Sequence, residues 1–230
     1  MTEGDDTGVG LRERKKRETR VALSRATIGL CIQRGWDNVT VEDIAAAANV
    51  SVRTFRNYFA NKAEAIAAGH LERMLRIADD LRARPVGEPL WESVAHVVQA
   101  QFAPPGEAAA GAHPDHPDHP GQPDQPGQPD HPDHADQRWA DGLRLMLAEP
   151  ALQGEVVKAN AAAQQELARA VAERTGTDAA RDVYPTLVAA VIGAGSAVAV
   201  EHCLRADPPA PLGPVLREVF DRVTAGLPTP

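Results

Sequence analysis

Apolar residues recur at helical spacing along most of this chain, and the pattern predicts a protein built from α-helices. The first such stretch covers residues 12–34, and its apolar positions are Leu23, Ala26, Thr27, Leu30 and Cys31. Their separations of three and four residues place them on one face of an amphipathic helix. Gly35, which accepts a positive φ, follows Arg34 and predicts the end of this helix.

Two short helices joined by a tight turn are expected next. Thr40 is expected to cap the first, with Asp43 as the acid of a capping box, and Ser51 to cap the second, which runs to about Phe59. Asn49 lies between them, and asparagine enters the left-handed conformation more readily than other non-glycine residues. A pair of helices with a turn of three to four residues is typical of a helix-turn-helix unit.

Longer helices are predicted in the rest of the chain. Asn61 and Glu64 indicate the start of a helix that ends near Arg84, because Pro85 follows. Later apolar patterns predict helices over about 137–148, 150–175, 179–205 and 214–225. We therefore expect an all-α fold of about nine helices. Its expected parts are a disordered acidic tail (1–11), a helix-turn-helix domain (12–61) and a helical ligand-binding and dimerisation domain (62–226).

Residues 104–136 break the helical pattern. Proline recurs at every third position from 114 to 132, between His, Asp, Gln and Gly. This spacing favours extended polyproline II, and the polar remainder cannot form a core. We interpret the segment as a disordered insertion in the second domain. A tract without a folded neighbour binds metal weakly, so we expect no metal site from its histidines, which are His113, His116, His119, His131 and His134.

The composition fits packed helices. Hydrophobic residues make up 43% of the 230 residues but aromatic residues only 4%, so the core must be built mainly from Ala, Val and Leu. Two cysteines, Cys31 and Cys203, lie in apolar helical patterns and exclude a disulfide scaffold. The first ten residues are acidic and polar and lack the apolar run of a secretory signal, so we expect a cytoplasmic protein.

Charge is distributed unevenly along the chain. The formal net charge is −8, but residues 11–62 contain eleven Lys and Arg against five Asp and Glu, a formal +6. A basic amino-terminal region in an otherwise acidic chain suggests that this region binds a polyanion. The alternative is a small helical bundle with a solvated basic surface.

The helix expected at 51–59 carries the side chains that suit DNA. Arg53 and Asn57 can each make bidentate contacts to base edges, and Thr54 can contact a thymine methyl group. Donors for phosphate oxygens are expected at Thr40, Tyr58 and Lys62. Phe55 and Phe59 are four residues apart and should face inward. The basic arm, whose DNA-contacting members are Arg14, Lys15 and Lys16, should add affinity that does not depend on sequence.

The run TVEDIAAAANVSVRTFRNYFANKAEAI over residues 40–66 resembles the DNA-binding region of TetR-type repressors, and the likeness extends over about 12–74. It implies a three-helix DNA reader, a connecting fourth helix and a carboxy-terminal domain that binds a small-molecule effector and forms a homodimer. Thr54, Tyr58, Phe59 and Lys62 match family positions. The departures are Arg56, where the family usually has an aromatic residue, and Asn49, where it usually has Gly. The resemblance places Ser51, Val52 and Arg56 among the DNA-binding residues.

An uncharged stretch over residues 183–200 suggests how two chains would associate. Its Gly193–Gly195 pair lacks the third small residue of a dinucleotide loop, and Pro185 and Thr186 make it a poor membrane span. We expect instead a helix buried between its own domain and the same helix of a second subunit, beside the last helix. The residues expected in this dimer interface are Ala189, Gly193, Ala197, Val200, Val219 and Phe220.

The sequence predicts a ligand-responsive transcriptional repressor that binds a palindromic double-stranded DNA operator as a dimer. Candidate pocket residues, each of which could equally be simple core, are Trp91, Phe102, Trp139, Met146 and Tyr184. We find no catalytic motif and expect neither cofactor nor enzyme activity. The alternatives are a membrane-associated or constitutive helix-turn-helix protein without an effector and, more remotely, a helical enzyme or carrier.

Overall fold

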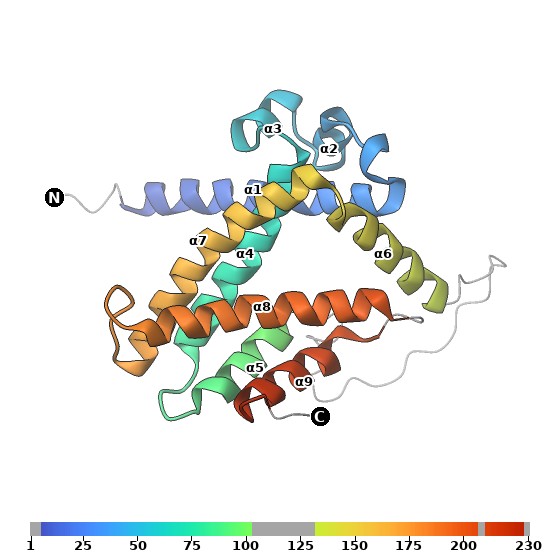
Figure 1. The fold of residues 1–230 in the computed structure, drawn as a ribbon. Helices are drawn as coiled ribbons and strands as arrows, with labels where there is room; N and C mark the ends of the chain where they lie inside the picture. The colour runs from blue at the N-terminus through green and yellow to red at the C-terminus, as the bar shows by residue number, and fades with distance from the viewer. Residues whose placement is uncertain (1–5, 103–131, 207–209, 228–230) are drawn as a thin grey trace, which may run out of the picture.

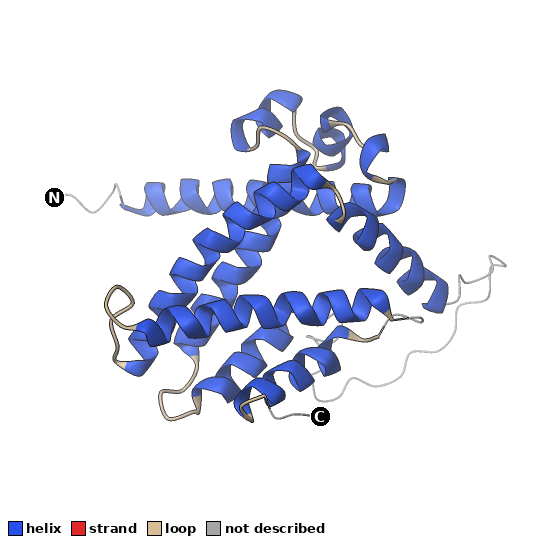
Figure 2. Ribbon diagram, in the orientation of Figure 1, coloured by secondary structure: helices blue, strands red, loops and turns tan. Residues whose placement is uncertain are grey.

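The computed structural model describes residues 6–102, 132–206 and 210–227. Within these ranges the protein is all helical, with nine α-helices, one short 3₁₀ helix and no strand, as Figures 1 and 2 show. The helices are α1 (Asp6–Arg34), η1 (Trp36–Asn38), α2 (Val41–Ala47), α3 (Val52–Tyr58), α4 (Lys62–Ala83), α5 (Leu90–Phe102), α6 (Pro132–Leu147), α7 (Pro150–Thr175), α8 (Val183–Arg205) and α9 (Leu212–Thr224).

The amino-terminal helices form a small unit around α1. Helix α1 crosses the molecule, α2 and α3 lie on one side of it, and α4 descends on the other side toward the carboxy-terminal helices (Figure 1). The helix begins at Asp6, six residues before the position expected from its apolar pattern. Residues 6–11, expected as part of a disordered tail, are therefore helical.

Local capping fixes the two short helices as predicted. Thr40 and Asp43 form a complete capping box, because the Thr40 hydroxyl accepts the Asp43 N–H at 3.1 Å and the Asp43 carboxylate accepts the Thr40 N–H at 2.9 Å. Asn49 has φ +53, and the N–H groups of Asn49 and Val50 donate to the carbonyls of Ala46 and Ala45. This is a Schellman turn, which satisfies two carbonyls at the end of α2 and aims the chain into α3.

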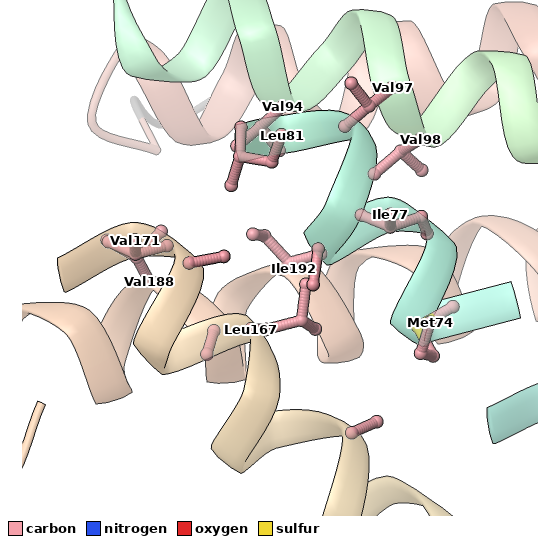
Figure 3. Close-up of a cluster of buried hydrophobic side chains, with 14 of the residues drawn as sticks. Met74, Ile77, Leu81, Val94, Val97, Val98, Leu167, Val171, Val188 and Ile192 are labelled. Atoms are coloured by element: carbon pink, nitrogen blue, oxygen red, sulfur yellow. The ribbon is translucent and has the colours of Figure 1, made fainter. Parts of the chain in front are cut away.

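The carboxy-terminal helices enclose the larger core. Helices α4 and α7 lie side by side, α8 packs across α7, and α5 and α9 pack together on the far side (Figure 1). Their buried side chains meet at the centre of this group, which Figure 3 shows. The residues labelled there are Met74, Ile77, Leu81, Val94, Val97, Val98, Leu167, Val171, Val188 and Ile192.

A second core joins the amino-terminal unit to α6 and α7. It gathers Leu23, Ile44 and Phe55 from the first helices with Met146 and Leu152 from α6 and α7. Helix α6 also approaches α1 very closely, since a Cβ added at Gly142 would lie 2.5 Å from the Ile32 carbonyl oxygen. The amino-terminal unit is therefore packed against the carboxy-terminal helices through its own apolar contacts as well as through α4.

Charged side chains fasten α4 to α7 at the far end. Arg174 donates to the carbonyls of Arg84 at 3.0 Å and Pro85 at 2.7 Å, and so satisfies backbone groups where α4 ends. Arg82 pairs with Glu166 and Glu173, both at 2.7 Å. The hydrogen bonds to these carboxylates raise the pKa of Arg82 above its ordinary value. These contacts hold α4 against α7 where α5 begins.

Besides the start of α1, three element boundaries differ from the sequence expectation. Helix α8 begins at Val183, because the Asp178 carboxylate accepts the Ala180 N–H and the Asp182 carboxylate accepts the Asp178 N–H in a separate turn. Pro185, which lacks an N–H, then falls in the first helical turn, where no hydrogen-bond donor is required. Helix α6 begins at Pro132, inside the expected insertion, whose residues 104–131 lie outside the described part of the chain. Helix α9 begins at Leu212 rather than near Pro214.

Candidate functional sites

The inner face of α3 is anchored in the core. Phe55 and Phe59 are fully buried with ring centroids 5.8 Å apart, as the spacing of four residues predicted. The Arg20 guanidinium of α1 lies 4.8 Å from the centroid of the Phe59 ring. These contacts fix the orientation of α3, so its opposite face must point away from the molecule.

The outer face of α3 presents unpaired polar side chains. Arg53, Arg56 and Asn57 are exposed, and α3 contains no acidic residue. None of these three side chains makes a hydrogen bond or ion pair with the rest of the described chain. Two guanidinium groups and one amide are thus available together to a partner that presents oxygen and nitrogen acceptors.

The hydroxyls expected near phosphate or bases have intramolecular partners. The Ser51 Oγ accepts the Thr54 N–H at 3.0 Å and lies 2.8 Å from the Thr54 Oγ1. The Thr40 Oγ1 lies 2.5 Å from an Asp43 carboxylate oxygen. Val52 and Tyr58 are half-buried, with the Tyr58 ring 6.4 Å from that of Phe59. Thr40 and Ser51 therefore act first as helix caps.

Lys62 was expected to face phosphate, but the structure turns its ammonium group toward its own chain. The Nζ donates to the carbonyls of Trp36 and Val39 and lies 4.4 Å from the centroid of the Trp36 ring. Lys62 therefore ties η1 to the start of α4. A lysine three residues after the end of a predicted recognition helix gives no sign of this contact, since its partners lie more than twenty positions earlier.

The basic arm lies on a helix. Arg14, Lys15 and Lys16 are exposed on α1, and Arg14 is 3.6 Å from Glu18 in an exposed pair between successive turns. Such pairs contribute little stability. The positive charges of this segment are accordingly held in fixed directions by the helix instead of lying on a flexible tail.

The outer face of α8 is apolar and open. Val183, Leu187 and Val198 are 79%, 56% and 55% exposed, and Ala194 between them is exposed as well. A Cβ added at Gly193 would meet nothing within 4 Å. This helix was expected to bury one face against its own domain and the other against a second subunit, and within one chain it is buried on one side only.

Two residues expected in the dimer interface are interior residues. Ala189 and Phe220 are each 1% exposed, so neither can contact a second chain in this conformation. Phe220 stacks on Trp91 with ring centroids 6.4 Å apart and packs against Gly195 of α8. Three of the expected interface residues, Ala189, Gly193 and Ala197, are four positions apart. Because 3.6 residues make one helical turn, such a row winds around the helix, and Ala189 is buried, Gly193 half-buried and Ala197 exposed. Val200 and Val219 are half-buried.

Of the helices in the described part of the chain, α8 alone has the length and apolar composition to cross a membrane. Its most apolar window has a mean hydropathy of 1.8, and a third of that window is buried inside the protein. The other residues of the window are half-buried or exposed.

The described candidate pocket residues lie in more than one part of the structure. Trp91 and Phe102 pack against the larger core, Met146 belongs to the second core, and Tyr184 is 45% exposed. The side chain of Trp139 lies outside the described residues. The sequence grouped aromatic residues from separate helical patterns, which carry no signal for the distances between those helices.

The sequence matches known families in both halves. The family model described as bacterial regulatory proteins of the tetR family matches residues 23–68. The model described as the MftR C-terminal domain, also a TetR-type domain, matches residues 128–228. The first match covers α2 and α3 and the second covers α6 to α9, so both halves of the fold are represented.

Whole proteins give the same result. The HTH-type transcriptional regulator TcmR of Streptomyces glaucescens is 30% identical over 213 residues, which make up 90% of this chain and 82% of that protein. The fatty acid degradation regulator FadR from Bacillus halodurans superposes with a TM-score of 0.50 at 16% identity, over 90% of this chain and 98% of that one. The second likeness concerns the fold.

Proposed function

Because this chain belongs to the TetR family of bacterial transcriptional regulators, we propose that it is a ligand-responsive repressor that binds a palindromic DNA operator as a homodimer. The observation that carries the proposal is the outer face of α3, where Arg53, Arg56 and Asn57 stand exposed and unpaired above a buried Phe55–Phe59 anchor. Such a face matches the acceptor-rich edges of the major groove.

In the proposed complex α3 enters the major groove. Arg53 and Asn57 contact base edges, and Arg56 lies beside them as a cation for a base or a phosphate oxygen. The exposed cations of α1, Arg14, Lys15 and Lys16, approach the backbone and add affinity that decreases with salt. Two copies related by a twofold axis read two half-sites about 34–36 Å apart, or somewhat more.

The exposed apolar face of α8 supports the homodimer. Val183, Leu187, Ala194 and Val198 follow one side of the helix from its first residue to seven residues before its end. Packing this side against the same side of a second chain, with α9 alongside, removes apolar surface from water. This arrangement is isologous, so it places the two α3 helices symmetrically.

Release by a small molecule in the carboxy-terminal domain follows from the path of α4. Only three residues separate the end of α3 from the start of this helix, which continues into the larger core and packs along α7. A ligand that favours one position of α4 changes the spacing of the two α3 helices, provided that it binds the two arrangements with different affinity.

A DNA selection with the purified protein, including DNA from upstream of its own gene, tests this function. We expect a near-palindromic site, and we expect Arg53→Ala and Asn57→Ala each to lose about 1–3 kcal/mol of discrimination at defined base pairs. Arg181→Ala is the matched control, because Arg181 is an exposed arginine in the turn before α8. Failure to select any site at low ionic strength would refute the proposal.

The exposed apolar surface of α8 also favours one alternative, a membrane-associated helix-turn-helix regulator. It predicts that the purified protein partitions into detergent micelles through residues 183–200. The dimer predicts instead a discrete mass of two chains in detergent-free buffer.

A further inference from the structure

A crevice lies between α1 and α4, outside the surfaces described above. Its outer part has a volume of about 410 Å³ and its inner part about 80 Å³. Both parts are lined by Val21 and Arg25 of α1 and by Glu72 and Arg76 of α4. A water molecule occupies about 30 Å³ of liquid, so the inner part has room for a group of a few heavy atoms.

Positive charge in this crevice exceeds negative charge. The two carboxylates that line it already have cationic partners, since Glu72 pairs with Arg17 at 2.6 Å and Glu18 lies 3.6 Å from Arg14. Arg25, Arg73 and Arg76 also line it, and none of the three makes an ion pair or hydrogen bond with any described residue. Three arginines without a carboxylate partner therefore line the same crevice.

Two of these unpaired guanidinium groups destabilise the folded protein. Arg73 is half-buried with its guanidinium 4.9 Å from the centroid of the Phe102 ring, and burial together with the neighbouring charge of Arg76 lowers the pKa of Arg73. The Nε of Arg76 is buried without a hydrogen-bond partner. A buried donor or charge without a partner is destabilising, which makes such a pair unusual unless something else binds it.

A fourth unpaired donor faces the inner part of the crevice. Ser24 is 3% exposed, and its Oγ has no hydrogen-bond partner. The hydroxyl lies opposite Gly69 of α4, where an added Cβ would be 2.3 Å from the Oγ. Gly69 thus leaves the space into which the hydroxyl points, and this donor and the guanidinium groups line one hollow.

We propose that this crevice binds a small oxyanion, a phosphate or carboxylate group, through Arg25, Arg73 and Arg76 with the Ser24 hydroxyl as an additional donor. Guanidinium groups match the geometry of both oxyanions and bind them in a bidentate manner. The ligand bridges the two helices, because Ser24 and Arg25 belong to α1 whereas Arg73 and Arg76 belong to α4. It therefore fixes the angle between the DNA-reading unit and the helix that leads to the larger core.

The DNA backbone is not the proposed ligand. Figure 1 shows α2 and α3 on one side of α1 and the descending part of α4 on the other. The crevice is lined by residues of α1 and by Ala68 to Arg76 of α4, and no residue of α2 or α3 lines it. A small solute reaches the crevice through its outer part. Binding of an oxyanion here does not depend on whether an effector binds the carboxy-terminal domain.

Calorimetric titration and thermal unfolding of the full chain, with pyrophosphate in one arm and citrate in the other at constant ionic strength, test the proposal. We expect saturable one-site binding in at least one arm and a Tm that rises with ligand concentration. The preferred arm distinguishes a phosphate from a carboxylate ligand. No saturable binding in either arm would overturn the proposal.

Variants separate binding from a structural role. Arg76→Met keeps the apolar stem, so it should weaken binding at least about tenfold and raise the Tm of the unliganded protein by removing an unpaired cation. Exposed Arg25→Gln should weaken binding about tenfold without changing the unliganded Tm. Arg181→Met, with the same loss of charge in the turn before α8, should change neither quantity. Wild-type affinity in both crevice variants, or a lowered unliganded Tm for Arg76→Met, would contradict the assignment.

Discussion

Helices α3 and α8 each bury one face and expose the other, but their exposed faces have opposite chemistry. The outer face of α3 carries Arg53, Arg56 and Asn57, which have no partner in the described chain. The outer face of α8 carries Val183, Leu187 and Val198, which water hydrates poorly. Each exposed face indicates its partner, a polyanion for α3 and another apolar surface for α8.

The two helices also differ in how they are held. Seven-residue α3 depends on the Ser51 cap, the Schellman turn at Asn49 and two buried aromatic rings. Helix α8 has 23 residues, and its inner face joins the larger core through Val188 and Ile192. A short helix anchored on a few contacts orients side chains accurately, whereas a long helix supplies a continuous area for association.

The largest effect is expected at the anchor of α3. Phe55→Ala should lower the free energy of unfolding by about 3–5 kcal/mol, because it leaves a cavity beneath the helix. Arg53→Ala on the outer face should change it by at most about 0.5 kcal/mol. Urea denaturation of both variants measures the contrast. Similar losses for the two would show that the outer face of α3 is not free.

The next effect concerns the apolar face of α8. Leu187→Asp introduces a charge on each side of the proposed interface, and burying an unpaired charge costs roughly 3–5 kcal/mol, so the dimer dissociation constant should rise at least about hundredfold. Sedimentation velocity measures the shift toward monomer. Leu227→Asp, at an exposed leucine beyond α9, is the matched control and should leave the dimer intact. Dimers in both variants would place the interface elsewhere.

Substitution of Lys62 distinguishes a structural role of this lysine from a contact with DNA. Because its ammonium group binds two carbonyls and the Trp36 ring, Lys62→Met should lower the free energy of unfolding by about 1–2 kcal/mol. The salt dependence of DNA binding should stay close to that of the wild type, whereas Lys16→Met should reduce its slope by about one. A reduced slope for Lys62→Met with unchanged stability would restore the phosphate contact.

The smallest expected effect is a dependence of stability on pH, and it arises at a contact between α4 and α7. His70 of α4 bonds to Asn160 of α7 at 2.6 Å, and burial lowers the pKa of His70 below its ordinary value near 6.5. The unfolded chain then binds this proton more readily than the folded one. The contribution of His70 to stability is therefore fully present above about pH 6.5 and is lost as the pH falls through the lower folded-state value.

His70→Gln should make the stability of the protein depend less on pH. Thermal unfolding between pH 7 and 5 measures it, with His96→Gln as the control, since His96 is exposed on α5. Equal slopes in the wild type and His70→Gln would show that His70 does not contribute.

Features determined by neighbouring residues were predictable from the sequence. The capping box at Thr40, the cap at Ser51, the left-handed Asn49 and the inward pair Phe55–Phe59 all depend on separations of four residues or fewer. Periodicity within one helix therefore identified both the fold class and the face of α3.

Features determined by distant residues were not predictable. Lys62 finds its partners at Trp36 and Val39, and Phe220 stacks on Trp91, more than a hundred positions earlier. An apolar position looks the same in sequence whether it faces its own core or a second subunit. Only the packing of α8 on α7 shows that Leu187, and not Ala189, lies at the surface.

The most direct test of the central claim, that the outer face of α3 reads DNA, is a methylation-interference experiment on the selected operator. The account predicts interference at guanines in two major-groove faces about one helical turn apart or somewhat more, and loss of interference at one guanine of each half-site in Arg53→Ala. Interference confined to the minor groove, or an unchanged pattern in Arg53→Ala, would contradict it.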